Sequence, residues 1–119
     1  MILSENREDE LRKFATKIRL NTLRTLNHLG FGHYGGSLSI VEVLAVLYGE
    51  IMPMTPEIFA ARDRDYFVLS KGHAGPALYS TLYLNGFFDK EFLHSLNTNG
   101  TKLPSHPDRN LTPGIDMTT

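Results

Sequence analysis

Three histidines stand in loops beside glycine or proline, where their side chains could do chemistry. His33 lies in FGHYGGS, His73 in SKGHAGP and His106 in LPSHPDR. An imidazole titrates near neutral pH, so it can donate, accept or move a proton. A single loop histidine is more often structural than catalytic, but three in the same kind of setting favour a functional role. These three residues are therefore the first candidates for a site.

The turn around His73 makes the strongest physical case. It follows a short apolar run and precedes a predicted helix that Pro76 begins. In an open parallel sheet, ligands bind beyond the carboxyl ends of the strands, and a helix N-terminus there favours phosphate. Gly72 and Gly75 would let a ligand approach the backbone, whereas Lys71 is a weaker candidate because a lysine at a turn is commonly only solvated. The turn predicts an anion-binding corner and leaves its ligand open.

Two other chemistries use the same residue types. Zinc could be held by three histidines, but no His-x-x-x-His or His-x-His pair supports such a site. A serine nucleophile has candidates in Ser37, Ser39 and Ser70, yet the sequence lacks a Gly-x-Ser-x-Gly elbow. The other two histidines, His28 and His94, lie within helical patterns and are assigned to surface or interface packing.

Helices must position these loops, because apolar residues recur at helical spacing over much of the chain. A first amphipathic helix is predicted from Ser4, as its N-cap, to about Leu29, with Gly30 at C′. After the glycine-rich loop, a second helix is apolar on nearly every side and is expected to be buried. Ser37 or Ser39 would cap it.

Four shorter elements are predicted next: a helix capped by Thr55 with Pro56 at its first position, a strand at Phe67–Leu69, a helix at Pro76–Asn85, and a helix from near Asp89 to a stop at Asn99-Gly100. The strand is continuously apolar, which is typical of an interior strand in a parallel sheet. Such a strand needs neighbours on both edges, and the sequence offers no second strand of similar strength. We therefore expect a helix-rich part of an α/β domain whose parallel sheet is incomplete in this chain.

Composition excludes several classes of protein. The 119 residues suit one domain or part of one, and 12 basic against 13 acidic residues, without a basic block, argue against a nucleic-acid binder. The absence of cysteine excludes a disulfide framework and a thiolate nucleophile. The N-terminus is charged too early for a signal peptide, and no apolar run reaches the roughly 18 residues of a membrane span. We expect a cytoplasmic protein that binds neither nucleic acid nor membranes.

Four motifs, in order and with similar spacing, resemble the N-terminal part of transketolase. They are GHYGGSLS, RDRDYFVLSKGHAGPALY, LPSHPDR and TPGIDMTT. The first two are quite specific, and the resemblance runs from about Leu11 to Thr119. It implies that residues 1–119 are the N-terminal part of a single thiamine diphosphate-binding α/β domain.

The resemblance also implies an activity and roles for the histidines. Transketolases transfer a two-carbon ketol unit from a ketose to an aldose, usually as sugar phosphates of the pentose phosphate pathway, with thiamine diphosphate and Mg²⁺ as cofactors. His73, with Gly72, would lie at the cofactor diphosphate and the reaction centre. His33 would contact donor hydroxyls or assist proton transfer, and His106 would hydrogen-bond the donor near its C1 hydroxyl and carbonyl. All three are thus implied catalytic residues.

Some features depart from the family pattern. Tyr34 stands where the family often has proline, which predicts a less rigid loop, and Gly75 replaces a more usual serine. A Gly-Asp-Gly…Asn motif for Mg²⁺ and the pyrimidine-binding domain with its glutamate are absent from this sequence. We therefore expect the chain alone to be inactive and to bind thiamine diphosphate weakly or not at all. We expect it to need a companion C-terminal half or subunit, within a homo- or hetero-oligomer.

Other interpretations stay open at this point. The chain could belong to another two-carbon transferase, such as 1-deoxyxylulose-5-phosphate synthase or dihydroxyacetone synthase. The pairing of LPSHPDR with TPGIDMTT favours transketolase over the first of these. From a different class, the chain could be a non-catalytic interaction fragment that docks on a partner.

Overall fold

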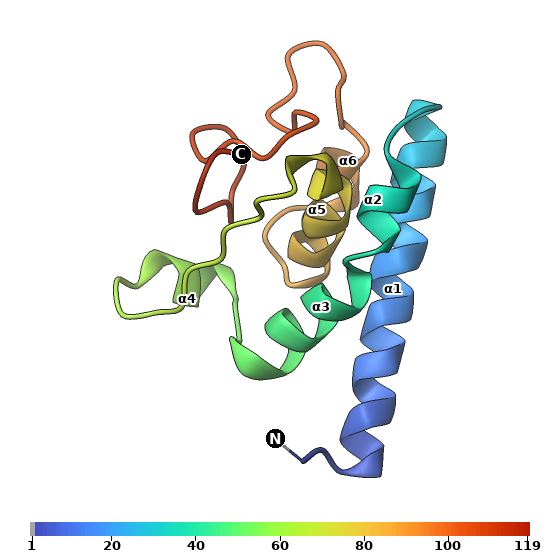
Figure 1. The fold of residues 1–119 in the computed structure, drawn as a ribbon. Helices are drawn as coiled ribbons and strands as arrows, with labels where there is room; N and C mark the ends of the chain where they lie inside the picture. The colour runs from blue at the N-terminus through green and yellow to red at the C-terminus, as the bar shows by residue number, and fades with distance from the viewer. Residues whose placement is uncertain (1) are drawn as a thin grey trace.

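A computed structural model describes residues 2–119 as helical segments arranged around one central helix, α5 (Figure 1). In chain order the segments are α1 (Glu5–Leu29), α2 (Tyr34–Leu38), α3 (Val41–Val46), the π-helix η1 (Leu47–Ile51), α4 (Pro56–Ala60), the 3₁₀ helix η2 (Gly72–Ala74), α5 (Gly75–Leu84) and α6 (Lys90–Leu93). The long helix α1 runs along one side of the molecule, and both α3 and α5 pack against it (Figure 1). The loops after α6 cover the end of α5 at which the candidate residues lie (Figure 1).

Helix α1 follows the sequence prediction at both ends. The Ser4 side chain accepts a hydrogen bond of 3.1 Å from the backbone N–H of Arg7. At the other end Gly30 adopts φ 97°, and its N–H donates to the Leu26 carbonyl. That left-handed conformation favours glycine, so the helix stops where the sequence predicts. The buried stripe of α1 consists of Leu11, Ala15, Ile18, Thr22, Thr25 and Leu26.

The second predicted helix is broken, and its predicted cap was wrong. The glycine-rich segment is itself helical, so Ser37 lies inside α2, Ser39 ends it, and neither side chain caps α3. The prediction of burial all round was also wrong. Val41 and Leu44 are 0% exposed, but Val43 is 52% exposed. The reason is that α1 and α5 cover one face of α3 and leave the other uncovered.

Residues Tyr34–Ile51 form a helical stretch of 18 residues that is long and apolar enough to cross a membrane by length and composition. The stretch is divided between α2, α3 and η1, and α3 packs on both α1 and α5. Glu42 within it forms an ion pair with Arg19 of α1. Of this stretch 28% is buried inside the described structure, so length and composition alone are weak evidence for a membrane span.

The helices around the site also follow the sequence closely at their starts. The Thr55 hydroxyl accepts from the N–H of Ile58 at 3.2 Å, and the Asp89 carboxylate accepts from the N–H of Phe92 at 2.8 Å. Every residue of α5 from Gly75 to Leu82 is buried, which makes it the core helix. The predicted stop of α6 at Asn99-Gly100 was wrong, because the helix ends at Leu93.

The predicted strand at Phe67–Leu69 is not confirmed, because no strand is formed in the part of the chain that the structure describes. Residues 65–69 are extended but unpaired, since no described segment forms a ladder with them. The Phe67 N–H donates instead to the Asp116 carboxylate at 2.8 Å. Tyr66 and Val68 are 62% and 51% exposed, whereas Leu69 is 4% exposed. The predicted parallel sheet is therefore not confirmed within residues 2–119.

Candidate functional site

The fold brings the three loop histidines into one cluster. The rings of His33 and His73 meet edge to face, with centroids 4.5 Å apart, and those of His73 and His106 do the same at 4.4 Å. All three side chains are exposed, so a ligand can reach them. They come from separate loops, and His73 is the central member. We call His33, His73 and His106 the histidine cluster.

Short helical turns hold the first two members of the cluster. His33 immediately precedes α2, and its carbonyl accepts from the N–H of Ser37 at 3.0 Å. His73 lies in η2, which leads directly into α5 and packs against α2. Lys71 points to α2 as well, since its Nζ lies 2.6 Å from the Ser39 hydroxyl. The lysine thus links the two turns that carry the histidines.

Close packing against α5 positions His106. The Tyr79 hydroxyl of α5 donates a 2.6 Å hydrogen bond to the Pro104 carbonyl. Burial raises the pKa of Tyr79, so this hydroxyl stays protonated and remains a donor. Gly72 and Gly75 leave no room for a side chain: a Cβ at Gly72 would lie 2.7 Å from His106 Nδ1, and one at Gly75 would lie 2.7 Å from the Ser105 carbonyl oxygen. At Gly75 the chain's own loop occupies the approach that the sequence suggested for a ligand.

This packing predicts that Gly75→Ala forces residues 104–107 away from α5. We expect a loss of about 1–3 kcal/mol in the free energy of unfolding, because the added Cβ meets a backbone carbonyl that cannot yield without moving the loop. Gly36→Ala is the matched control, since a Cβ at Gly36 meets nothing within 4 Å. It should leave stability unchanged or raise it by up to about 1 kcal/mol. Urea denaturation of the complete protein measures both, and equal effects would contradict the argument.

A small pocket of about 70 Å³ opens between the cluster and the end of α1. Its polar lining includes His33 and His73, together with Asn97 and Ser105. The Asn97 side-chain amide donates to the Ser105 hydroxyl at 2.5 Å, and Asn97 has φ 58°. Sequence reasoning did not single out Asn97 or Ser105. Ser105 had a signal in its position next to His106, whereas Asn97 had none.

A second feature that sequence reasoning missed is a buried ion pair. Arg64 and Asp116 are 2.7 Å apart, and their side chains are 8% and 7% exposed. Arg64 also donates to the Phe59 carbonyl at 2.8 Å and lies over the rings of Phe59 and Tyr66. Because Asp116 additionally accepts from the Phe67 N–H, the pair joins the extended segment before the His73 turn to the C-terminal loop beside His106. It therefore supports the cluster without touching it.

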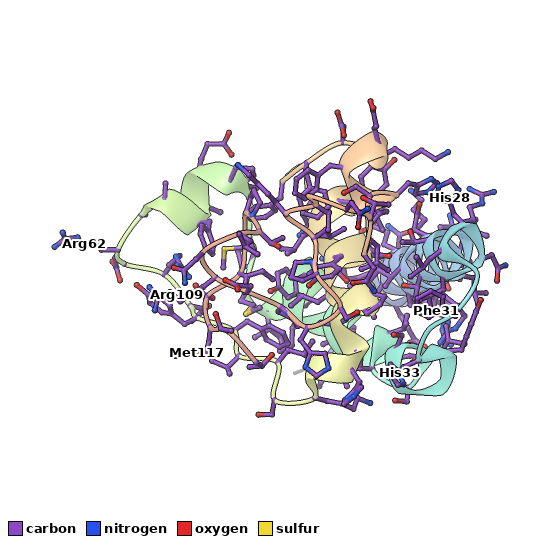
Figure 2. The ribbon with its side chains drawn as sticks, turned by 90° about the horizontal axis from the view of Figure 1, so that it is seen from above. His28, Phe31, His33, Arg62, Arg109 and Met117 are labelled. Carbon is purple, nitrogen blue, oxygen red and sulfur yellow. The ribbon has the colours of Figure 1, made fainter. Side chains whose placement is uncertain are left out.

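The remaining two histidines form a separate pair. The rings of His28, in α1, and His94, after α6, stack at 5.0 Å between centroids. Burial lowers the pKa of His94, and the positive charges of His28 and Lys90 lower it further. Their predicted role in packing is consistent with this helix-to-helix contact. In Figure 2 His28 lies by the end of α1, while His33 lies lower on the side of α2.

The described residues offer polar groups that fit thiamine diphosphate. Within residues 2–119, no group of three or more His, Cys, Asp or Glu side chains is arranged to hold a metal ion, so no ligand set for Mg²⁺ is found there. Thiamine diphosphate fits the donor set: exposed imidazoles, and beside His106 a buried Thr119 hydroxyl without a protein partner. The role of Gly72 in cofactor binding stays a prediction. His106 and the Thr119 backbone lie against it.

The opening of the site is bordered by loops from both halves of the chain. Figure 2, seen from above, shows Phe31 by the end of α1 and His33 by α2, with Arg109 and Met117 of the C-terminal loop on the opposite side of the view. Phe31 and Met117 are 63% and 46% exposed. Of these two, Phe31 lines the pocket.

Comparison with known proteins identifies what this arrangement resembles. Residues 11–119 match the family described as transketolase, thiamine diphosphate binding domain. A 6-deoxy-6-sulfo-D-fructose transketolase subunit, SqwG, of Clostridium sp. (strain MSTE9) is 53% identical over 117 residues, which cover 98% of this chain and 42% of that protein. The transketolase of Treponema pallidum (strain Nichols) is 35% identical over 113 residues, covering 94% of this chain and 17% of that protein.

Comparison of the fold with solved structures also finds transketolases. The structure of transketolase from Leishmania mexicana superposes with a TM-score of 0.85 at 31% identity, covering 92% of this chain and 16% of that chain. The sequence thus spans less than half of the length of each of these relatives. The match extends over the segments that carry all three members of the histidine cluster.

Proposed function

The chain belongs to the transketolase family, and from that premise we propose that it forms the N-terminal part of an enzyme that transfers a two-carbon ketol unit from a ketose to an aldose. The single observation that carries this proposal is the histidine cluster, in which three imidazoles from separate loops meet at an exposed surface. Ketol transfer needs groups that exchange protons near neutral pH around a reacting carbonyl. Three adjacent imidazoles supply such groups.

The division of roles follows what the family resemblance implies. His73, whose ring lies between the other two, is assigned to the cofactor diphosphate and the reaction centre. His33 is assigned to donor hydroxyls or proton transfer at the pocket that it shares with Asn97. His106 is assigned to the C1 hydroxyl and carbonyl of the donor. Each imidazole can accept a proton at one ring nitrogen while it donates from the other.

Thiamine diphosphate, when bound, supplies the carbon nucleophile that carries the two-carbon unit. The residues of this chain that would hold it are His73, Gly72 and the buried hydroxyl of Thr119. That hydroxyl has no protein partner, and a buried polar group of this kind gains from a ligand that bonds it. Gly72 is buried, its N–H donates to the Ser70 carbonyl at 3.0 Å, and the His106 ring and the Thr119 backbone lie close against it, so we assign it to shaping the turn beside the cofactor.

The substrate proposed is a ketose with an anionic group at the end remote from its carbonyl. The name of the Clostridium relative states 6-deoxy-6-sulfo-D-fructose, in which a sulfo group takes the place of a phosphate. The names of two further relatives state apulose 4-phosphate. We assign the neutral end of the sugar to the cluster, because its polar groups are imidazoles and, in the pocket, an amide and a hydroxyl.

A companion polypeptide is proposed to complete the active site. The Clostridium relative and the apulose-4-phosphate transketolase relative of Actinobacillus succinogenes both carry names that describe them as subunits. Residues 65–69 are extended with exposed Tyr66 and Val68, so they are available to pair with a strand supplied elsewhere in the complete domain. The predicted parallel sheet would form in that way.

The test is an assay of the complete natural protein with its companion subunit, thiamine diphosphate and Mg²⁺. Parallel reactions would use 6-deoxy-6-sulfo-D-fructose, fructose 6-phosphate and pyruvate as donors, each with an aldose phosphate acceptor. We expect two-carbon transfer from one or both ketoses and none from pyruvate, which is the donor expected of a 1-deoxyxylulose-5-phosphate synthase. Omission of the companion should abolish the reaction. Turnover of pyruvate alone, or of no donor, would overturn the proposal.

The interaction-fragment alternative is separated by a triple variant in which His33, His73 and His106 are changed to alanine. If the chain is a docking fragment, the triple variant should bind its partner as tightly as the wild type does. If the chain is part of the proposed enzyme, the variant should still bind the companion subunit but lose turnover.

A further inference from the structure

The loop that presents His33 is closed by one side-chain hydrogen bond. The Tyr34 hydroxyl donates to the Asn27 side-chain oxygen at 2.7 Å, which joins the start of α2 to the last turn of α1. Arg19 of α1 also pairs with Glu42 beyond the loop, but among residues 2–119 the bond from Tyr34 to Asn27 is the only side-chain hydrogen bond that joins α1 to α2. Tyr34 is half-buried and packs against the hydrophobic core, whereas Asn27 is exposed. The ring of Tyr34 is thus anchored, and its hydroxyl reaches back to a rigid helix of 25 residues.

The loop itself has little to hold it in place. Gly30 and Gly32 both have positive φ, at 97° and 150°, and neither offers a side chain. A Cβ at Gly32 would lie 2.4 Å from Leu26 Cδ2, so the loop passes directly over α1. Phe31 between them is 63% exposed. The course of the backbone into His33 therefore depends on what fixes the residue after it.

His33 depends on that backbone for its position. Its side chain makes no capping hydrogen bond to α2, and its ring contacts the His73 ring at 4.5 Å between centroids. A ring contact of this kind orients an exposed imidazole only weakly. The backbone of Tyr34 is adjacent, so a shift there moves the His33 Cα directly.

We propose that Tyr34, through its hydrogen bond to Asn27, is a positioning residue that sets where His33 stands over the pocket, and hence how the enzyme binds the hydroxyl-bearing part of its donor sugar. This inference rests on the proposed function, because that function gives His33 a donor sugar to contact. Tyr34 itself touches no reacting atom in this scheme. It acts by fixing the turn from which the imidazole projects.

The test compares Tyr34→Phe with Asn27→Ala and Asn27→Asp in the complete enzyme with its companion. Loss of one exposed neutral hydrogen bond is expected to lower kcat/KM for the donor by roughly 2- to 10-fold. Tyr34→Phe and Asn27→Ala should share this loss, and Asn27→Asp, which keeps an acceptor oxygen, should restore the wild-type value. Tyr66→Phe is the matched control, because its hydroxyl is exposed and makes only a 3.4 Å contact with the Arg62 carbonyl. It should behave as wild type.

A further experiment distinguishes an effect on the position of His33 from an effect on the stability of the protein. In a His33→Ala background, Tyr34→Phe should cause no additional loss, since the group that it positions is gone. The melting temperature should differ little among these variants. A loss that persists in full without His33 would overturn the inference, and so would a Tyr34→Phe enzyme with normal kcat/KM.

The failure of this inference can be told apart from the failure of the proposed function. If His33→Ala lowers turnover while Tyr34→Phe does not, the positioning role is wrong and the assignment of His33 stands. If His33→Ala has wild-type kinetics for every donor, the assignment of His33 fails and the inference fails with it. Activity of the wild-type enzyme on a ketose donor is the reference in both cases.

Discussion

His73→Ala in the complete enzyme is expected to lower kcat/KM by roughly 10²- to 10⁴-fold, the range associated with loss of a positioned proton-transfer group. His73 is the central ring of the histidine cluster, in contact with both neighbours at 4.4 and 4.5 Å between centroids. Its removal takes away one imidazole and separates the other two. Steady-state kinetics with a ketose donor and an aldose acceptor would measure the effect.

Stability should change far less than rate in this variant. The His73 side chain is exposed, so little buried surface is lost, and a change within about 0.5 kcal/mol is expected for unfolding. His28→Ala is the control, because it removes an exposed imidazole outside the cluster and should leave turnover near normal. Near-normal turnover in His73→Ala would contradict the site assignment. A large loss of stability would show instead that His73 is structural.

Asp116→Ala carries the largest expected effect on stability, about 3–5 kcal/mol, because it leaves the Arg64 guanidinium buried without its partner. The carboxylate also holds the N–H of Phe67, so the extended segment and the C-terminal loop lose a shared anchor. The free energy of unfolding of the complete protein, measured by urea denaturation, would report this loss.

A surface ion pair provides the comparison. Arg12 and Glu8 are 2.8 Å apart in α1 with side chains 74% and 52% exposed. Arg12→Ala should therefore destabilise the protein far less than Asp116→Ala, since water screens such a pair. If Asp116→Ala were no more harmful than Arg12→Ala, the buried pair would not be the anchor that its geometry suggests.

The ends of the helices could be predicted from local sequence because local chemistry decides them. Ser4, Thr55 and Asp89 each accept a backbone N–H three residues ahead, and Gly30 takes a left-handed conformation that other residues avoid. Such interactions lie within a few residues of chain. The same reasoning failed for Ser37 and Ser39, where the glycine-rich segment became a helix of its own and displaced the predicted cap.

Contacts between segments that are far apart in the chain could not be predicted from local sequence. The apolar run at Phe67–Leu69 has the composition of a strand, but a strand requires a neighbour, and the described residues supply a carboxylate instead. The partner of Arg64 lies 52 positions further along the chain, and nothing near either residue marks the pair. The less rigid loop expected from Tyr34 stays a prediction, and the structure adds a hydrogen bond to Asn27 that only the turn between α1 and α2 makes possible.

The sequence by itself determined which residue types the site uses, because imidazoles beside glycine or proline and the four transketolase-like motifs are visible without coordinates. It also determined where most helices begin, since those signals are local. Only the tertiary structure decided that His33, His73 and His106 form one cluster with His73 at its centre. The physical reason is that their spacing depends on how α2, η2 and the loop after α6 pack on α5, through contacts between residues far apart in the chain.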